Sequence, residues 1–252
     1  MNTAAKTIIT LFSIATVIAI IAGVYMHVLG ERGFSLSAKK VEDKVSLDGP
    51  LARLSVDIDY ADVTLQPGKE LSVAYALPES MVPVVTLENG TLEVKSPDSF
   101  VPIPWQTDGK NYVTITIPEK SELDLAIMKA DAGNQKVTGL KCDKLDIQGD
   151  AGNVNIQNTQ AMEISAQVDA GNVQLEGCAM DVLEVKADAG NLDMSDCSIE
   201  RIDADLDAGN IEAKNSRIES GDCKTSLGNI SLSGDIGDVR AKSSLGNASI
   251  SQ

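Results

Sequence analysis

The chain lacks aromatic residues and prolines throughout its C-terminal half. Of its 252 residues only eight are Phe, Trp or Tyr and eight are Pro, and neither kind occurs within residues 119–252. Aromatic side chains usually contribute much of the buried area of a globular core, and proline cannot donate a hydrogen bond within a sheet. The absence of both excludes an ordinary sandwich, barrel or α/β core for this half.

Basic residues and histidine are also scarce. The chain has 21 Lys and Arg against 37 Asp and Glu, a net charge of −16. Binding to nucleic acid requires clustered Lys and Arg, so a nucleic-acid partner is excluded. The single histidine, His27, lies in an apolar run, and most zinc sites and histidine-based triads need that residue. We therefore expect no metal site, no cofactor and no enzymatic activity.

Residues 7–30 form the only long apolar run and contain no Asp, Glu, Lys or Arg. A membrane-spanning helix needs about 20 mostly apolar residues, so this run is long enough. A cleaved signal peptide is the alternative, but its apolar core is usually shorter and is followed by a small-residue cleavage site. Lys6 precedes the run and favours a cytoplasmic N-terminus. We predict an anchor over residues 1–33, bound to the membrane through this helix, and an extracytoplasmic domain over residues 34–252.

A repeat of 19 residues organises the second half of the chain. The tetrapeptide Asp-Ala-Gly-Asn occurs five times at this spacing, and Ser-Leu-Gly-Asn follows at Ser226 and Ser244. If the first residue of the tetrapeptide is position 1, apolar residues alternate with polar ones around positions 5, 7, 15 and 17. Alternation is typical of strands, and a short fixed period is typical of solenoids. The sequence predicts an all-β parallel β-helix with regular coils of about 19 residues over residues 123–252.

The tetrapeptide is interpreted as a structural corner. Glycine at its third place supplies a positive φ, the aspartate can form an Asx turn, and stacked asparagines can hydrogen-bond along the coils. The turn and ladder residues are Asp131, Gly133, Asn134, Asp150, Gly152, Asn153, Asp169, Gly171, Asn172, Asp188, Gly190, Asn191, Asp207, Gly209, Asn210, Gly228, Asn229, Gly246 and Asn247.

A degenerate copy of this coil precedes the regular ones. Residues 59–65 match the corner and the two apolar positions that follow it, so residues 50–65 are predicted as the first coil. Residues 66–122 contain alternating runs at 71–76, 91–95 and 112–117, and we expect them to form strands and loops that cap one end of the stack.

These motifs resemble a known bacterial family. The first coil reads LSVDIDYADVTLQPG, a later strand reads YVTITIP, and Gly-Asn coils follow. Through these motifs, roughly residues 50–252 resemble a bacterial family of unknown function that is labelled "putative adhesin". The resemblance implies a β-helical protein with a surface or envelope role, often preceded by a membrane span, and it carries over no catalytic residues.

Three groups are candidate sites. The corner aspartates could bind calcium, but an Asx-turn role is favoured because serine replaces aspartate in two corners. Cys178 and Cys197 share position 10 of adjacent coils, close enough for a disulfide, although they could equally be small core residues. Phe100, Trp105 and Tyr112 flank a loop that either binds a partner or plugs the end of the solenoid.

The function expected from these features is that of a non-catalytic cell-surface or envelope protein, adhesin-like or scaffolding. Its partner would be a cell-wall polymer or an envelope protein. Two alternatives stay open: a module that senses or regulates envelope stress, and a glycan-binding or glycan-active β-helix.

Overall fold

A computed structural model describes residues 40–97 and 110–251. Within these two ranges no helix has the length and apolar character needed to cross a membrane. The span expected over residues 7–30 lies outside the described residues, as do Phe100 and Trp105 of the loop.

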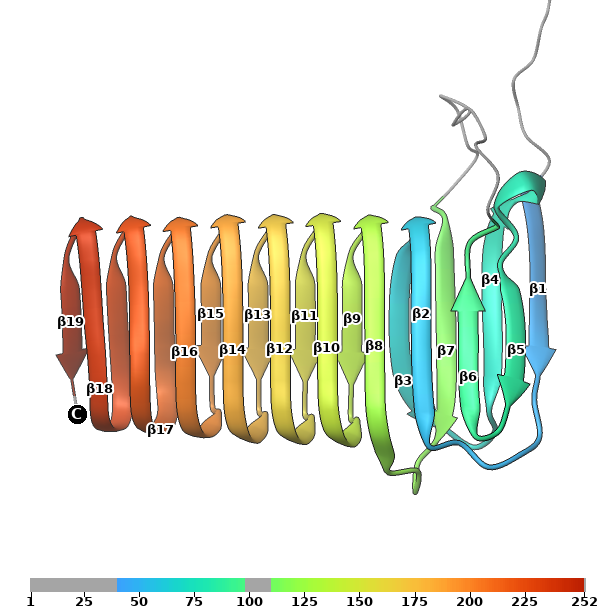
Figure 1. Ribbon diagram of the computed structural model, residues 1–252, viewed down its shortest axis with the longest axis horizontal. Coiled ribbons are helices and arrows are strands. Elements are labelled where there is room, and N and C mark those ends of the chain that lie inside the picture. Colours follow the sequence, from blue (N-terminus) through green and yellow to red (C-terminus); the bar gives the residue numbers. More distant parts are fainter. Residues whose placement is uncertain (1–39, 98–109, 252) are drawn as a thin grey trace, which may run out of the picture. The chain divides into compact units, whose positions relative to one another are not determined.

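The described part is an all-β solenoid, as the repeat predicts, and each coil contributes one long and one short strand (Figure 1). The long strands form one layer and the short strands the other. The long strands are β8 (Leu123–Ala132), β10 (Lys141–Ala151), β12 (Gln160–Ala170), β14 (Ala179–Ala189) and β16 (Ser198–Ala208). The short strands are β9 (Gln135–Thr138), β11 (Val154–Gln157), β13 (Val173–Glu176) and β15 (Leu192–Ser195).

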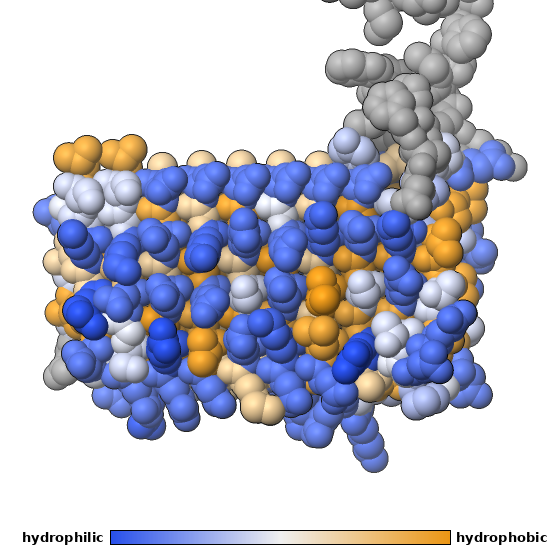
Figure 2. Space-filling model, in the orientation of Figure 1, coloured by the Kyte–Doolittle hydropathy of each residue, from blue (hydrophilic) through white to orange (hydrophobic). Residues whose placement is uncertain are grey.

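Neighbouring coils stack in parallel with a register of 19 residues. Val154 of β11 lies opposite Val173 of β13, which lies opposite Leu192 of β15. Because the register equals the repeat, each position forms a column along the stack, and the inward positions form a continuous aliphatic core. Outward positions form rows of mainly hydrophilic side chains along the surface (Figure 2). The core is thin and filled by small and branched side chains, which explains the lack of aromatics.

The last coils merge their strands. They consist of β17 (Ile211–Leu227), β18 (Ile230–Leu245) and β19 (Ala248–Ser251). The register between β17 and β18 shifts from 19 to 18 residues between Ala213 and Ser216. This bulge absorbs the residue that is missing between the Ser226 and Ser244 corners.

Each regular coil turns at two corners. At the first, glycine adopts a positive φ, such as +142° at Gly152. A Cβ atom there would lie 2.1 Å from the carbonyl oxygen of Gly133 in the preceding coil, so the stacked backbone leaves no room for a side chain. The second corner, at position 9, also has a positive φ, and the sequence analysis did not identify it. Its residues are Gly139, Asn158, Gly177, Asp196 and Asn215.

The asparagines at the first corner form a hydrogen-bonded ladder. In the four steps from Asn134 to Asn210, the backbone N–H and the side-chain Nδ2 of one asparagine donate to the Oδ1 of the asparagine one coil earlier, whereas in the last two steps only the backbone N–H donates. Asn172, for example, donates to Asn153 over 3.0 and 3.1 Å. The Asx turn expected from the corner aspartates is absent, since no hydrogen bond reaches their carboxylates in residues 40–97 and 110–251. The preceding coil's asparagine accepts the N–H groups instead.

The degenerate first coil is also present. It consists of β2 (Arg53–Tyr60) and β3 (Asp62–Gly68), which pair in parallel with β8 and β9. Its register agrees with the sequence match, because Val63 lies opposite Gln135 and Leu65 opposite Val137. Asp62 takes the place of asparagine here. Its carboxylate accepts both donors of Asn134 at 2.9 Å and so starts the ladder.

The cap covers the outer side of this first coil. The three predicted runs are strands β4 (Ser72–Pro78), β6 (Thr91–Lys95) and β7 (Tyr112–Pro118). β6 and β7 pair in parallel with β2 and β3, and β4 pairs antiparallel with β7. Two further strands were not predicted: β1 (Lys40–Ser46) pairs antiparallel with β4, and β5 (Val84–Glu88) forms a hairpin with β6. A short 3-10 turn, η1 (Glu79–Met81), follows β4.

Candidate functional site

Tyr112, the one described residue of the predicted aromatic loop, belongs to the cap. It begins β7, lies between β3 and β4, and its hydroxyl donates to Glu42 Oε1 over 3.3 Å. Partial burial and then the Glu42 carboxylate raise the pKa of Tyr112. Its contacts connect strands of the cap.

Cys178 and Cys197 are free thiols and do not form the disulfide considered above. They lie in a buried column with Leu140, Thr159 and Ser216, where their Sγ atoms donate to backbone carbonyls. The interaction with the neighbouring thiol lowers the pKa of Cys178 and raises that of Cys197. Both side chains are buried and act as part of the core.

All four cysteines are expected to be inaccessible in the folded protein. Thiols react as thiolates, and burial raises the pKa of Cys142 and of Cys223 to about 12, so both are protonated at neutral pH. Cys178 and Cys197 are protected by burial itself, since they are only 2% and 3% exposed. An Ellman assay should detect no rapidly reacting thiol before denaturation and four afterwards. Two thiols rather than four after denaturation without reductant would establish a disulfide.

The corner aspartates form an acidic column along one side of the stack. The pKa of Asp131 is raised, first by desolvation and then by the nearby negative charges of Asp150 and Asp59. No bond to a corner carboxylate offsets this repulsion among the described residues. The column is therefore tolerated by the fold rather than required by it.

Asp131→Asn is expected to stabilise the protein at neutral pH. A carboxyl with a raised folded-state pKa binds its proton more tightly when folded, so ionisation above that pKa lowers the free energy of unfolding. The gain should be small, a rise in melting temperature of about 1–3 °C at pH 7, and should vanish below pH 3.8, the ordinary value. Calorimetry at both pH values tests it. Destabilisation at pH 7 would instead show that this carboxylate makes a stabilising bond.

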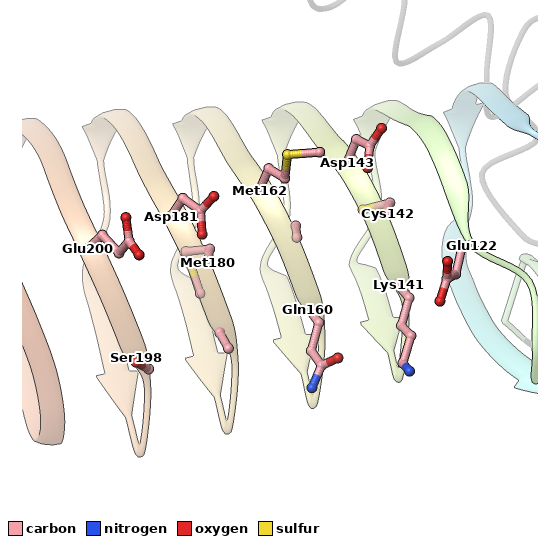
Figure 3. A pocket seen from close by; sticks show the side chains of 12 residues that line it. Glu122, Lys141, Cys142, Asp143, Gln160, Met162, Met180, Asp181, Ser198 and Glu200 are labelled. Atoms are coloured by element: carbon pink, nitrogen blue, oxygen red, sulfur yellow. The ribbon is translucent and has the colours of Figure 1, made fainter.

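A groove on the side of the stack is lined by residues from five neighbouring coils (Figure 3). Its volume is about 430 Å³. We call it the lateral groove, and it is lined by Glu122, Lys141, Cys142, Asp143, Gln160, Ala161, Met162, Ala179, Met180, Asp181, Ser198 and Glu200. A second hollow of about 450 Å³ lies in the cap between the segment after β1 and the segment before β4.

The lateral groove lies where the pairing register of the long strands has a gap. Cys142 pairs with Ala161 and Lys144 with Glu163, whereas the residues between them, Asp143 and Met162, have no partner in the register. The same gap recurs in each of the next two pairs of coils. Because this gap recurs at the same position of each coil, the repeat itself extends the groove along the solenoid.

Three columns make up the groove. The middle one faces inward and includes Cys142, Ala161 and Met180. Ala161 has a smaller side chain than its neighbours in the middle column. Ala179 is likewise small in the adjacent column, which also contains Lys141 and Gln160, and the two small side chains deepen the groove. The outer column carries carboxylates at Asp143, Asp181 and Glu200 and a methionine at position 162 (Figure 3).

The groove places exposed carboxylates beside one buried thiol. Its carboxylates are exposed, and its one buried nucleophile, the Cys142 thiol, has a pKa raised to about 12. No aromatic side chain lines it, although aromatic faces are common platforms for ligands. The sequence analysis missed this site because its residues are ordinary members of repeat columns, and only the Asp-to-Met change at position 162 marks it.

Comparisons with known proteins agree with the fold. The family model described as Toastrack DUF4097 matches residues 51–252. A crystal structure of a "putative adhesin" from Bacteroides fragilis has 17% identity and a TM-score of 0.58, covering 86% of this chain and 98% of that chain. A "putative lipid binding protein" from Parabacteroides distasonis has 16% identity and a TM-score of 0.50, covering 84% and 96%. No curated protein matches the sequence. At these identities the structural likeness concerns the fold alone.

Proposed function

The chain belongs to the Toastrack DUF4097 family, and on this premise we propose that it is a non-catalytic, adhesin-like protein of the cell surface. Its solenoid would act as a rigid scaffold that presents a binding surface to an envelope protein or a cell-wall polymer. The name of the Bacteroides fragilis relative, an adhesin, is consistent with this role.

One observation carries the proposal: the lateral groove combines exposed carboxylates with an apolar floor on a continuous stack of coils. In residues 40–97 and 110–251 there is no histidine. Long loops that would bring acid and base groups over the groove are also missing there, because tight corners join the strands of the regular coils. Binding modules need a preformed, rigid surface, and stacked coils supply one.

The apolar run over residues 7–30 would hold the protein in the membrane, with the solenoid on the extracytoplasmic side. The run is long enough to span a bilayer, and Lys6 before it favours a cytoplasmic N-terminus. An external location also suits the acidic composition, since net charge keeps an exposed surface soluble.

Surface labelling of intact bacteria that produce the full chain tests this proposal. A membrane-impermeant, lysine-directed biotin reagent should label the protein in intact cells, and the protein should fractionate with membranes and resist alkaline extraction. The matched variant lacking residues 7–30 should stay in the soluble fraction and escape labelling. Labelling of the full chain only after lysis would refute the proposed location.

A further inference from the structure

We propose that the lateral groove binds an extended, positively charged peptide segment of a partner protein, in which aliphatic side chains separate the cationic ones. This inference rests on the proposed function, because it names the class of ligand for the exposed site described above.

The charge of the groove is the first argument. Four carboxylates line it, from Glu122, Asp143, Asp181 and Glu200, against one cation, Lys141. Among the described residues none of these four carboxylates forms an ion pair or a hydrogen bond. Some carboxylates beside the groove and further along the stack are paired, as in Lys144–Glu163 at 2.5 Å and Arg240–Asp222 at 3.4 Å. The groove thus retains a row of unpaired negative charges that a cationic ligand can pair with.

The apolar side chains are the second argument. Met162 is 53% exposed in a column that otherwise holds Asp143, Asp181 and Glu200. A flexible thioether adapts to different partner side chains, and the floor beside it is formed by Ala161 and Met180. The aliphatic stems of Lys and Arg pack on apolar surfaces while their charged ends pair with carboxylates. The groove offers both features side by side (Figure 3).

The dimensions indicate an extended segment. Five coils at a spacing of about 4.8 Å give a strip about 19 Å long, and an extended chain rises about 3.3 Å per residue, so about six residues fit. The strip runs across the strands, and on either side of its outer column the strand residues pair with those of the neighbouring coils. The ligand is therefore recognised through its side chains and does not add a strand to the sheet.

The same features disfavour other ligands. A sugar would find no aromatic face in the groove, and an anionic lipid surface would be repelled by the four carboxylates. Peptides with alternating acidic and aliphatic residues would meet the same repulsion, so the sign of the ligand's charge is the property to test.

The test is a binding titration with the full chain in detergent at low salt. The probe is a fluorescent hexapeptide of alternating lysine and leucine, and the control probe replaces lysine with glutamate. The groove variant is Asp143→Asn, Asp181→Asn and Glu200→Gln. The matched control is Asp169→Asn, Asp188→Asn and Asp207→Asn, which removes the same charge from the exposed corner column at the other end of the long strands. A further variant, Met162→Gln, keeps length and removes apolar character.

We expect the wild type to bind the lysine probe and not the glutamate probe. The groove variant should bind about tenfold more weakly, the corner variant should retain the wild-type affinity, and Met162→Gln should lose about threefold. Absence of binding of the lysine probe would overturn the proposal, and so would equal losses of affinity in the groove and corner variants. Groove-dependent binding of phosphatidylglycerol vesicles or of soluble peptidoglycan fragments in place of the probe would also overturn it. An unchanged affinity of Met162→Gln would overturn the apolar part. Surface labelling is measured separately, so these failures leave the proposed location intact.

Discussion

Replacing Gly152 with alanine is expected to destabilise the solenoid by at least about 3 kcal/mol, or to prevent folding. Gly152 has a φ of +142°, and a Cβ atom there would lie 2.1 Å from the oxygen and 2.7 Å from the carbonyl carbon of Gly133. Backbone of the neighbouring coil cannot move aside without breaking the stack. Urea unfolding followed by circular dichroism measures the loss.

Gly149→Ala is the matched control three residues earlier. The nearest atom to a Cβ atom at Gly149 is the side-chain Nε2 of Gln135, at 3.1 Å, and the preceding coil carries Ala130 in the same column. A flexible side chain can shift, so we expect a cost of about 1 kcal/mol or less. Equal losses at the two glycines would show that close stacking at the corner is not the cause.

Asn172→Ala is expected to cost about 2–3 kcal/mol, the second largest effect, because it removes three hydrogen bonds of the ladder. The Nδ2 of Asn172 donates to Asn153 over 3.1 Å, and its Oδ1 accepts from the backbone and side chain of Asn191 over 3.0 and 2.9 Å. The substitution leaves the backbone N–H of Asn191 without its acceptor.

Asn229→Ala supplies an internal control for the ladder. Its Oδ1 accepts one bond, from the Asn247 N–H at 3.0 Å, and among the described residues its Nδ2 donates none. Removing it should cost about 1 kcal/mol or less, measured by the same urea titration. If the two substitutions lower the free energy of unfolding equally, the side-chain hydrogen bonds of the ladder contribute nothing to stability.

The architecture could be predicted because one register repeats. A fixed spacing of Gly-Asn corners determines which residues stack, so alternation within one coil specifies the inward columns of all the others. The first coil could be recognised although its corner reads Asp-Tyr-Ala-Asp, because Val63 and Leu65 keep the two inward positions. Asp62 keeps the ladder acceptor in the same way.

The sequence did not predict details that depend on neighbouring coils. Gln135 occupies an inward position that is valine, leucine or isoleucine in the next five coils, and its buried Nε2 donates to the Gln148 carbonyl over 2.7 Å. Gly149 beside it leaves the necessary room. The corner at position 9 was missed because Gly, Asn and Asp alternate there without a constant residue. β1 was missed because it pairs antiparallel with β4, outside the repeat.

The candidate site was predictable only in part. The corner aspartates and the two cysteines attract attention in the sequence, yet the structure gives them structural surroundings. The lateral groove lies along a gap in the pairing register of the long strands, and such a gap leaves no signal in an alternating pattern. The replacement of carboxylate by Met162 in one column is visible only after the coils have been aligned.

Deleting one whole coil tests most directly the central claim that each 19-residue unit stacks in the same register. The chain lacking residues 169–187 joins Val168 to Asp188 and keeps every later column in place. Stability in a solenoid is roughly a sum over repeats and their interfaces, so urea unfolding should remain one cooperative transition with a modest loss. Deleting residues 169–177 instead shifts all later columns and should abolish folding. If the chain lacking residues 169–187 fails to fold, as is expected of the chain lacking residues 169–177, the claim of one repeated register is contradicted.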